Sequence, residues 1–411
     1  MKRRNSILFI SFLLYSISFA ETDHWYGWLG ENKTGYVNDF IPPKKWPQSL
    51  TQKWSISIGS GYGTPILKDN EIFTHTRKND QEYIACVNKE SGKIKWSKMY
   101  EAPFKMGGGG EKHGKGPKAS PVYSDGTLYT FGISGILSAW NTEDGEKLWS
   151  KSPGLSFGQP YAHWGVSNSP LVINNKLISL FGNDQKGALI ALDKDSGDTL
   201  WTLPCGGTCY SSPTIGTIGG ILQVVVLHHE SLIGVDPHSG ELLWEFPFPH
   251  KTHNQNMPTP VVHQGKVLFG GENRGVYCIE PKLKNGNWTL HKPWIQKDVA
   301  LNMASPLISN HLLFGLSHYG LGRLFCINPK TGKILWQGPP RTAQNAMFLS
   351  FRDHVLALTN NGNVKIYLNS ENAFQIVANY KVSDTQTWAP PVLLKQGLLI
   401  KNSQNLTLWN F

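Results

Sequence analysis

The sequence is poor in charged residues, which make up 17% of its 411 positions. Outside the N-terminus it has no apolar run approaching the roughly 18 uncharged residues needed to cross a bilayer as a helix. These shortages argue against long surface helices and exclude an ordinary membrane-spanning segment in the processed chain. Glycine, proline and tryptophan are abundant, with 42, 25 and 15 copies. This composition is typical of many short strands joined by tight turns, and it predicts an all-β fold.

Cysteine is also scarce, and familiar catalytic motifs are missing. The five cysteines are never adjacent, and neither a Cys-x-x-Cys-His segment nor a Gly-x-Ser-x-Gly motif is present. The glycine run from Gly107 to Gly110 lacks the Lys-Ser/Thr of a phosphate-binding loop, so it is interpreted as a flexible insertion. The sequence signals of haem attachment, serine hydrolysis and nucleotide binding are therefore absent.

The first twenty residues have the features of a secretory signal peptide. Lys2, Arg3 and Arg4 form a basic start, a short apolar stretch follows, and Ser18-Phe19-Ala20 supplies the small residues that signal peptidase needs. We expect residues 1–20 to be removed and the mature chain to be periplasmic or secreted, a retained N-terminal anchor being the alternative. No cysteine precedes Cys86, so a lipid anchor at the cleavage site is not supported.

The formal net charge is +10, but the basic residues are scattered. Binding of nucleic acid favours a basic stripe with interleaved aromatic residues, which is not seen here. We therefore expect no nucleic-acid partner. We interpret the scattered basic residues as a solvated surface that keeps a monomer in solution.

A six-residue pattern ending in tryptophan recurs along the chain. The copies are SGKIKW to Trp96, DGEKLW to Trp149, SGDTLW to Trp201, SGELLW to Trp244 and TGKILW to Trp336, with a divergent sixth, NGNW, at Trp288. Before each of the five close copies comes an apolar run and then Asn or Asp, four residues ahead of the glycine. This pattern predicts a hairpin whose Asx side chain bonds the turn while the glycine adopts a positive φ. We expect the tryptophan to open the next strand and to pack between neighbouring sheets.

A second landmark is a hydroxyl residue followed by proline. It occurs at Thr64-Pro65, Ser120-Pro121, Ser169-Pro170, Ser212-Pro213, Thr259-Pro260 and Ser305-Pro306, each before an apolar run. The gap from Pro306 to Pro391 fits two units, so a seventh unit near Leu349-Ser350 has lost its proline, and the count is eight.

These units predict an eight-bladed β-propeller of four-stranded antiparallel blades. Residues 52–56 look like a fourth strand with no blade before it, and residues 406–410 like a third strand with no fourth after it. Pairing of these N- and C-terminal strands closes the ring. The expected organisation is a signal peptide at 1–20, an N-terminal extension at 21–50 and the propeller at 51–411.

The Ser-Pro, Gly-x-Leu-x-Ala-Leu-Asp and Thr-Gly-x-x-Leu-Trp patterns resemble the propeller repeat of the pyrroloquinoline-quinone (PQQ) type. That family includes quinoprotein dehydrogenases and the outer-membrane assembly scaffold BamB. The resemblance covers nearly the whole mature chain and implies fold strongly but chemistry hardly at all. It leaves two functions open. One is an exported, non-catalytic binding or scaffold protein of the cell envelope, with an unknown protein, glycan or small-molecule ligand and no expected cofactor. The alternative is a PQQ- and calcium-dependent dehydrogenase.

The resemblance also says what such an enzyme would need. A quinoprotein dehydrogenase is expected to have a vicinal cysteine pair beside the quinone, Glu, Asn and Asp ligands for calcium, and a catalytic Asp. No two cysteines here are adjacent, which favours the non-catalytic interpretation. Calcium ligands would come from different blades and have no linear pattern, so the presence of a metal site stays open.

The cysteines fall into two groups. Cys86, Cys278 and Cys326 lie at one repeat position, held by Ala139, Ala191 and Gly234 in other blades, and are interpreted as small buried packing residues. Cys205 and Cys209 flank Gly206-Gly207-Thr208 and are predicted to form a short loop-closing disulfide in an exported protein.

The long polar and aromatic loops predict where a ligand binds. In a propeller, the loops between blades and those between second and third strands emerge on one face, and binding residues gather on such loops. Trp164 and Arg274 are the expected stacking and charge anchors. The histidine pair His228-His229 and the pattern His250-Lys251-Thr252-His253 are weak metal signals, and exposed loop histidines are the favoured interpretation. The candidate ligand-binding residues are His163, Trp164, His228, Glu272, Asn273, Arg274, His318, Tyr319 and Arg341.

Overall fold

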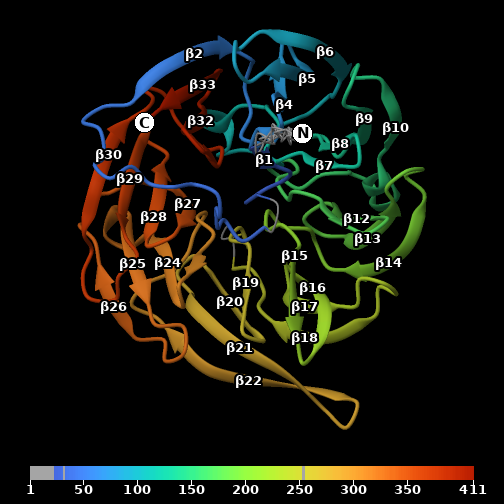
Figure 1. The fold of residues 1–411 in the computed structure, drawn as a ribbon. Helices are drawn as coiled ribbons and strands as arrows, with labels where there is room; N and C mark the ends of the chain where they lie inside the picture. Colours follow the sequence, from blue (N-terminus) through green and yellow to red (C-terminus); the bar gives the residue numbers. More distant parts are fainter. Residues whose placement is uncertain (1–22, 31–32, 252–254) are drawn as a thin grey trace, which may run out of the picture.

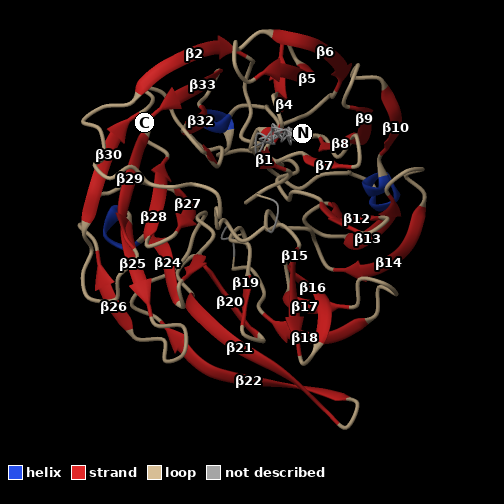
Figure 2. Cartoon of the chain, in the orientation of Figure 1, coloured by secondary structure: helices blue, strands red, loops and turns tan. Residues whose placement is uncertain are grey.

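The computed structural model describes residues 23–30, 33–251 and 255–411. Within these ranges the chain forms eight antiparallel sheets arranged around a central channel (Figure 1), and almost all of the regular structure is strand (Figure 2). This confirms the predicted eight-bladed propeller. The expected signal peptide at 1–20 lies outside the described residues.

The first four blades follow one another in chain order, and in each the innermost strand comes first. Blade 1 has five strands because a short N-terminal strand, β1, pairs with its innermost strand. The strands are β1 (His24–Trp25), β3 (Ile66–Lys68), β4 (Glu71–Lys78), β5 (Gln81–Asn88) and β6 (Ile94–Glu101) in blade 1; β7 (Val122–Ser124), β8 (Thr127–Phe131), β9 (Leu137–Asn141) and β10 (Lys147–Lys151) in blade 2; β11 (Leu171–Ile173), β12 (Lys176–Gly182), β13 (Gly187–Asp193) and β14 (Thr199–Cys205) in blade 3; and β15 (Thr214–Ile218), β16 (Ile221–Leu227), β17 (Ser231–Val235) and β18 (Leu242–Pro247) in blade 4.

The remaining blades keep the same order, except that the last takes its outer strand from the start of the chain. The strands are β19 (Val261–His263), β20 (Lys266–Gly271), β21 (Gly275–Lys284) and β22 (Asn287–Gln296) in blade 5; β23 (Leu307–Ser309), β24 (Leu312–Ser317), β25 (Arg323–Ile327) and β26 (Ile334–Gln337) in blade 6; β27 (Ala346–Phe351), β28 (His354–Thr359), β29 (Asn363–Leu368) and β30 (Ile376–Lys381) in blade 7; and β31 (Val392–Leu394), β32 (Gly397–Lys401), β33 (Asn405–Asn410) and β2 (Thr51–Ser57) in blade 8. Within the described ranges the helical segments are short 3₁₀ turns: η1 (Glu111–His113), η2 (Pro153–Phe157) and η3 (Tyr319–Leu321).

The ring closes as the sequence predicts. β2 pairs antiparallel with β33, with Trp54 opposite Leu408 and Ile56 opposite Leu406. The two ends of the chain therefore share one sheet, and neither β33 nor the core beneath it is left with an open edge. Blade 7 begins at β27 without the Ser/Thr-Pro pair, because Met347 and Phe348 occupy those two positions.

At six of the eight junctions a blade is joined to the next by the repeated tryptophan. The Trp54 indole N–H donates to the Lys89 carbonyl at 2.7 Å, and its ring covers Gly92 in the turn of blade 1, where a Cβ would lie 2.8 Å from the ring. Gly92 also has a φ of +69°, so the position requires glycine for two separate reasons. The same docking onto the following blade is made by Trp96, Trp149, Trp201, Trp294 and Trp336. The predicted packing of tryptophan between sheets is confirmed.

Blade 5 departs from the sequence prediction. Its docking residue is Trp294, which lies opposite Cys278, and not Trp288. The hairpin is longer because its turn has moved out to Asn285-Gly286, so β21 and β22 have ten residues each and project from the ring (Figure 1). Trp244 of blade 4 then has no standard turn to cover, and its indole donates instead to Gln223 in its own sheet.

The small residues on the third strands make room for these indoles. Cys86 lies opposite Trp96, Cys326 opposite Trp336, and each thiol is fully buried. Burial raises the pKa of Cys86 to about 12, so this thiol is not a reactive thiolate. The predicted packing role of these cysteines agrees with their positions.

The N-terminal extension is part of the core. Trp25 and Phe40 are 4% and 1% exposed, and Phe40 packs against Phe351 with ring centroids 4.7 Å apart. Asp23 anchors the start of the extension on the face of the Asx-Gly turns, where its carboxylate accepts from the Lys89 ammonium and the Lys395 amide, both at 3.1 Å. Figure 1 shows this dark-blue segment crossing the centre of the ring.

A buried polar group joins blades 1 and 2. The Glu82 carboxylate is fully buried and accepts from His75 Nε2 at 3.0 Å, from the Tyr100 hydroxyl and from the Ile133 amide at 2.8 Å. Burial alone raises the pKa of Glu82, but the His75 charge and these hydrogen bonds outweigh it and hold the pKa below its ordinary value. The group is sealed from solvent, so it stabilises the interface between the blades and is not a catalytic site.

Truncation of the extension tests its place in the core. Trp25→Ala and Phe40→Ala should each lower the free energy of unfolding by about 3–5 kcal/mol, because each removes a large side chain from a packed interior. Urea denaturation measures this, with the exposed His24→Ala as the control. Unfolding curves that match the unmodified chain would show that the extension is a dispensable linker.

The Glu82 group gives a prediction that depends on pH. Glu82→Gln should cost about 3–5 kcal/mol near neutral pH, since it removes one partner of a buried charge pair. A carboxyl whose pKa is lowered by folding stabilises above its unfolded pKa, and this contribution disappears as pH falls through the lower folded pKa. The stability gap between the two chains, followed by denaturant titration, should therefore narrow in acid. A gap that widens in acid would contradict the assignment.

Candidate functional site

A cavity of about 310 Å³ occupies the central channel. Its wall is built from two positions that recur in the blades: the residue that holds the Ser or Thr of the Ser/Thr-Pro pair, and the residue two places before it. Both positions lie where the connection from the previous blade enters the innermost strand. The repeat therefore places residues distant in the sequence in two adjacent rings around the channel.

The hydroxyl ring is linked from blade to blade. The amide of each member donates to the hydroxyl of the next at 2.8 to 3.0 Å. The linked residues are Thr64, Ser120, Ser169, Ser212, Thr259 and Ser305. In blades 7 and 8 the position is held by Met347 and Pro390, which have no hydroxyl. This ring satisfies buried backbone donors and fixes how closely the inner strands approach.

The second ring carries the chemical variety of the site. Every blade contributes the residue two places before its hydroxyl position, and all eight line the cavity: Tyr62, Lys118, Ser167, Tyr210, Met257, Met303, Asn345 and Trp388. These side chains are mostly aromatic or methionine, so the wall is largely apolar. One position, Lys118, is cationic.

Two other segments complete the cavity. Trp28 and Leu29 of the N-terminal extension line it, as do Gly109, Gly110, Lys112 and His113 in the connection between β6 and β7. The His113 ring packs edge-on against Trp388 with centroids 4.7 Å apart, and its Nδ1 lies 3.4 Å from the Tyr62 hydroxyl. The channel is therefore narrowed both by the extension and by the blade 1 to blade 2 connection.

The charged side chains in the described cavity wall are all of one sign. Lys112, His113 and Lys118 line it, whereas no Asp or Glu does so among the described residues. Burial lowers the pKa of Lys118 to about 8, and its ammonium donates to the Trp164 carbonyl at 2.6 Å. Burial, with the charges of Lys118 and Lys112, lowers the pKa of His113 to about 4, so this ring is neutral near pH 7. Lys118 is thus a cation without an acidic counterpart in the wall.

Of the predicted ligand-binding residues, Trp164 is the one that the structure places in the cavity wall. Its ring lies against Tyr210 with centroids 5.7 Å apart, and its indole N–H donates to the Gly108 carbonyl at 3.1 Å. The neighbouring His163 is exposed and meets the same carbonyl through Nε2 at 3.2 Å. These contacts tie the Gly107–Gly110 run to the loop of blade 3.

Arg274, the other predicted anchor, lies outside the cavity wall. Its guanidinium stacks over Phe248 at 4.0 Å and donates to the Pro249 carbonyl at 3.0 Å and to the Asn256 side chain. Burial lowers the pKa of Arg274 to about 10. All of these contacts are within the chain, and Arg274 does not line the cavity, so the structure gives it a bracing role between loops.

The other candidates lie on the same side of the ring but away from the cavity. His318 Nε2 lies 2.9 Å from the Asn273 side-chain oxygen, and the backbone of Arg341 is bonded to Gly320. Glu272 and Tyr319 are partly exposed neighbours of these residues. Together they join the loops of blades 5, 6 and 7 and do not form one pocket.

The interpretation of His228 and His229 as exposed loop residues is wrong. They are 4% and 2% exposed, because the connection after β18 folds back over them: the His250 and Phe248 amides donate to the carbonyls of His229 and Glu230. Burial lowers the pKa of His228 to about 4. No local sequence pattern indicates this cover, since it comes from a segment about twenty residues away.

The predicted disulfide between Cys205 and Cys209 is absent, and both thiols are free. Cys205 ends strand β14, while the Cys209 thiol turns inward and lies 2.5 Å from the Leu227 carbonyl of β16. Burial raises the pKa of Cys205 to about 12 and raises that of Cys209 further. The short spacing between the two cysteines does not show that one ends strand β14 while the thiol of the other contacts strand β16.

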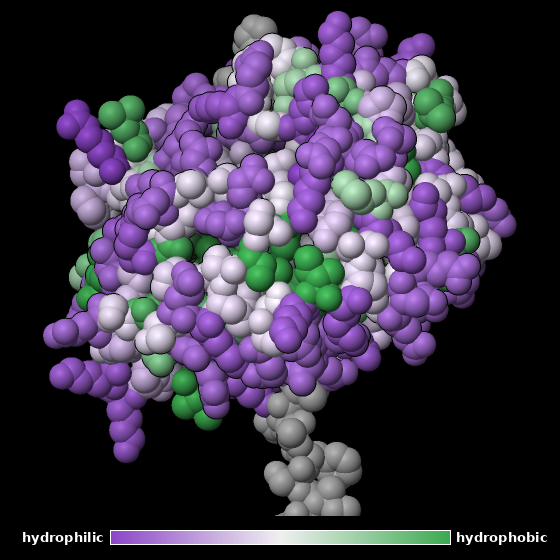
Figure 3. Space-filling model, turned by 90° about the horizontal axis from the view of Figure 1, so that it is seen from above, coloured by the Kyte–Doolittle hydropathy of each residue, from purple (hydrophilic) through white to green (hydrophobic). Residues whose placement is uncertain are grey.

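The surface around the ring is mainly polar. Figure 3, which views the ring from its edge, shows a predominantly hydrophilic surface with apolar residues in small groups. Large exposed apolar side chains recur on outer strands, for example Ile94, Leu148 and Leu200. Among the described residues, no helix is long and apolar enough to span a membrane.

Comparisons with known proteins agree on this architecture. Over residues 80–338 the chain matches the family model described as outer membrane protein assembly factor BamB. It is 24% identical over 229 residues to the assembly factor BamB of *Moranella endobia*, covering 55% of this chain and 53% of that protein, so the chain spans about half the length of this relative. It is also 30% identical over 262 residues to the quinoprotein alcohol dehydrogenase PedH of *Pseudomonas putida*, covering 56% of this chain and 39% of that enzyme.

Among solved structures, BamB from *Moraxella catarrhalis* superimposes with a TM-score of 0.63 at 15% identity, covering 88% of this chain and 98% of that one. At this identity the likeness supports the fold alone. The family match, by contrast, covers more than half of the chain and includes the repeats that build blades 2 to 6. The chain therefore belongs to the PQQ-type propeller family described as outer membrane protein assembly factor BamB.

Proposed function

We propose that this protein is an exported, non-catalytic propeller of the cell envelope that binds a small organic anion in its channel cavity. The observation that carries the proposal is Lys118: a partly buried cation in a largely apolar wall to which no described acidic residue contributes. Placing a charge in such surroundings is unfavourable unless it is paired. An anionic ligand supplies the missing partner.

The shape and lining of the cavity indicate the rest of the ligand. Tyr62, Tyr210, Trp164 and Trp388 present aromatic surface, and Met257 and Met303 present flexible apolar surface. Binding sites for small molecules combine such walls with a few placed polar groups. A molecule with a flat or apolar body and one acidic group, a carboxylate or a sulfonate, matches this combination.

The alternative, a PQQ- and calcium-dependent dehydrogenase, fits the residues less well. Calcium prefers oxygen ligands and usually takes several carboxylates, but among the described residues none lines the cavity. Neither does a cysteine, so the wall has no counterpart of the vicinal pair expected beside the quinone. A carboxylate that could act as general base for alcohol oxidation is likewise absent from the described part of the wall. We therefore derive no catalytic step.

The proposed place of action is the cell envelope. Support comes from the signal-peptide pattern of the first twenty residues and from membership of a family described by an outer-membrane assembly factor. A binding partner in an envelope assembly is compatible with a cavity ligand, because the loops that carry Arg274, His318 and Arg341 leave a separate surface on the same side of the ring.

Lys118→Met tests the proposal without changing the size of the wall residue. Blades 5 and 6 already have methionine at this position, so the substitution is compatible with the repeat. The fluorescent aromatic sulfonate 8-anilinonaphthalene-1-sulfonate should bind the unmodified chain, and the substitution should weaken it about tenfold or more, as expected for loss of a charge-assisted hydrogen bond.

Two controls sharpen this fluorescence titration. Lys333→Met, beside an Asx-Gly turn on the opposite face, should leave the affinity unchanged. The uncharged probe N-phenyl-1-naphthylamine has the same kind of aromatic body, so its affinity should not fall with Lys118→Met. Equal affinities of the sulfonate for the unmodified and Lys118→Met chains would refute an anion site at Lys118.

A further inference from the structure

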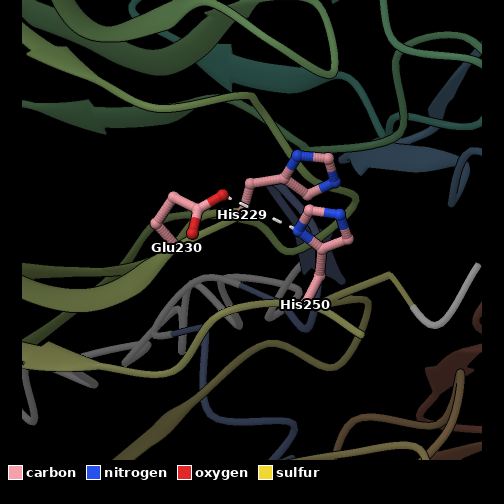
Figure 4. A group of neighbouring side chains, drawn as sticks. All are labelled: His229, Glu230 and His250. Atoms are coloured by element: carbon pink, nitrogen blue, oxygen red, sulfur yellow. Dashed lines mark ion pairs between the residues drawn. The ribbon is translucent and has the colours of Figure 1, made fainter. Parts of the chain in front are cut away.

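A second cluster of potential ligands lies on the loops of blade 4, outside the channel cavity. The side chains of His229, Glu230 and His250 offer ligand atoms that are all within 4.8 Å of one another (Figure 4). It is the one set of three or more His, Cys, Asp and Glu side chains with this spacing in the described part of the chain. None of the three lines the cavity.

The backbone around the cluster is held in place by hydrogen bonds. The His250 amide donates to the His229 carbonyl and the Phe248 amide to the Glu230 carbonyl, both at 2.8 Å. The buried Asn256 side-chain amide donates to the carbonyls of His228 at 2.7 Å and Phe248 at 3.1 Å. Two loops that are separated by strands β17 and β18 are therefore fixed side by side before any ligand arrives.

The two ring nitrogens of His229 have different hydrogen-bond partners. Nδ1 lies 2.7 Å from the Asp184 carbonyl, which can only accept, so Nδ1 carries the proton and Nε2 presents its lone pair. Metal-binding histidines are commonly oriented by this kind of Nδ1–H to carbonyl bond. Nε2 faces the side-chain amide of Gln255, with which it makes a hydrogen bond. An ion bound at Nε2 would replace this contact.

The ring of His250 has a nitrogen without a hydrogen-bond partner. Its Nδ1 is buried, has no hydrogen-bond partner, and lies 3.8 Å from a Glu230 carboxylate oxygen, too far for a hydrogen bond. In Figure 4 the Glu230 carboxylate points toward His250, and the two imidazole rings lie over each other. The unsatisfied nitrogen and the carboxylate therefore face the same small space.

We propose that His229, Glu230 and His250 form a binding site for a divalent transition-metal ion of the Zn²⁺ type. Two imidazoles and one carboxylate, with a further position left for water or Gln255, are a donor set that suits Zn²⁺ and not Ca²⁺. The rings are stacked 3.8 Å apart at 11°. Binding requires the partly exposed His250 to rotate about its side-chain bonds, so that a nitrogen and not the ring face is turned to the ion.

The site is coupled to the loop that carries Trp164. Asp184, whose carbonyl orients His229, accepts the His163 amide on its carboxylate at 2.6 Å. His163 precedes Trp164, which lines the channel cavity. An ion at the blade 4 loops would therefore also stabilise the position of one wall of the cavity.

Isothermal titration of the full mature chain with Zn²⁺ alone tests the site. One ion per chain should bind, and His250→Gln and Glu230→Gln should each weaken it about tenfold or more. Both side chains are at least partly exposed, so the variants should fold, and their melting temperatures without metal should match the unmodified chain. His238→Gln, at an exposed histidine on an Asx-Gly turn, is the matched control and should bind Zn²⁺ normally.

A spectroscopic measurement separates this site from scattered surface binding. Co²⁺ held by imidazole and carboxylate should give visible absorption that the His250→Gln chain lacks and the His238→Gln chain keeps. Ca²⁺ should give no binding heat. Zn²⁺ binding that is equal in the unmodified, His250→Gln and Glu230→Gln chains would overturn the proposal, as would loss of binding in His238→Gln alone.

Discussion

The structure depends on a tryptophan that docks onto the turn of the next blade at six of the eight blade junctions. In blades 1, 2, 3 and 5 the contact combines three features: an indole at the start of the outer strand, a small residue opposite it on the third strand, and a glycine with positive φ in the neighbouring turn. This explains why blade 4 changes when blade 5 lengthens its hairpin: without a turn to cover, Trp244 turns into its own sheet and requires Gly234 beneath it.

The tryptophan contacts lie on one face of the ring, so they do not restrict the residue types at the channel end of each blade. The turns beneath the tryptophans are nearly identical, whereas the residue two places before each hydroxyl ranges from serine to tryptophan. Because all eight of these residues point into one channel, a change at a single position alters the wall without altering the frame. Lys118 is such a change, and it places a positive charge in a ring of otherwise uncharged side chains. Function in this propeller therefore rests on individual positions within a common repeat.

The features that repeat from blade to blade could be predicted from the sequence. The contacts that one segment makes with another, distant segment could not. Blade number, ring closure, the docking role of the tryptophans and the packing of Cys86 follow from periodic patterns and are confirmed. The exposure of His229 was predicted wrongly because its cover comes from the segment around Phe248, which no local pattern connects to it, and the packing of Arg274 on the same segment could not be predicted for the same reason. An alignment of the eight units on their hydroxyl position predicts the second ring of the cavity. Loop length and polarity, by contrast, favour the longer connections.

The central claim is that the channel cavity holds one small organic anion, which pairs with Lys118. Native mass spectrometry of the exported chain, purified without denaturation, tests it most directly. We expect a population heavier by the mass of one small acidic molecule, released on denaturation and missing from the Lys118→Met chain. The same adduct on both chains, or a mass equal to that of the bare polypeptide for the unmodified chain, would contradict it.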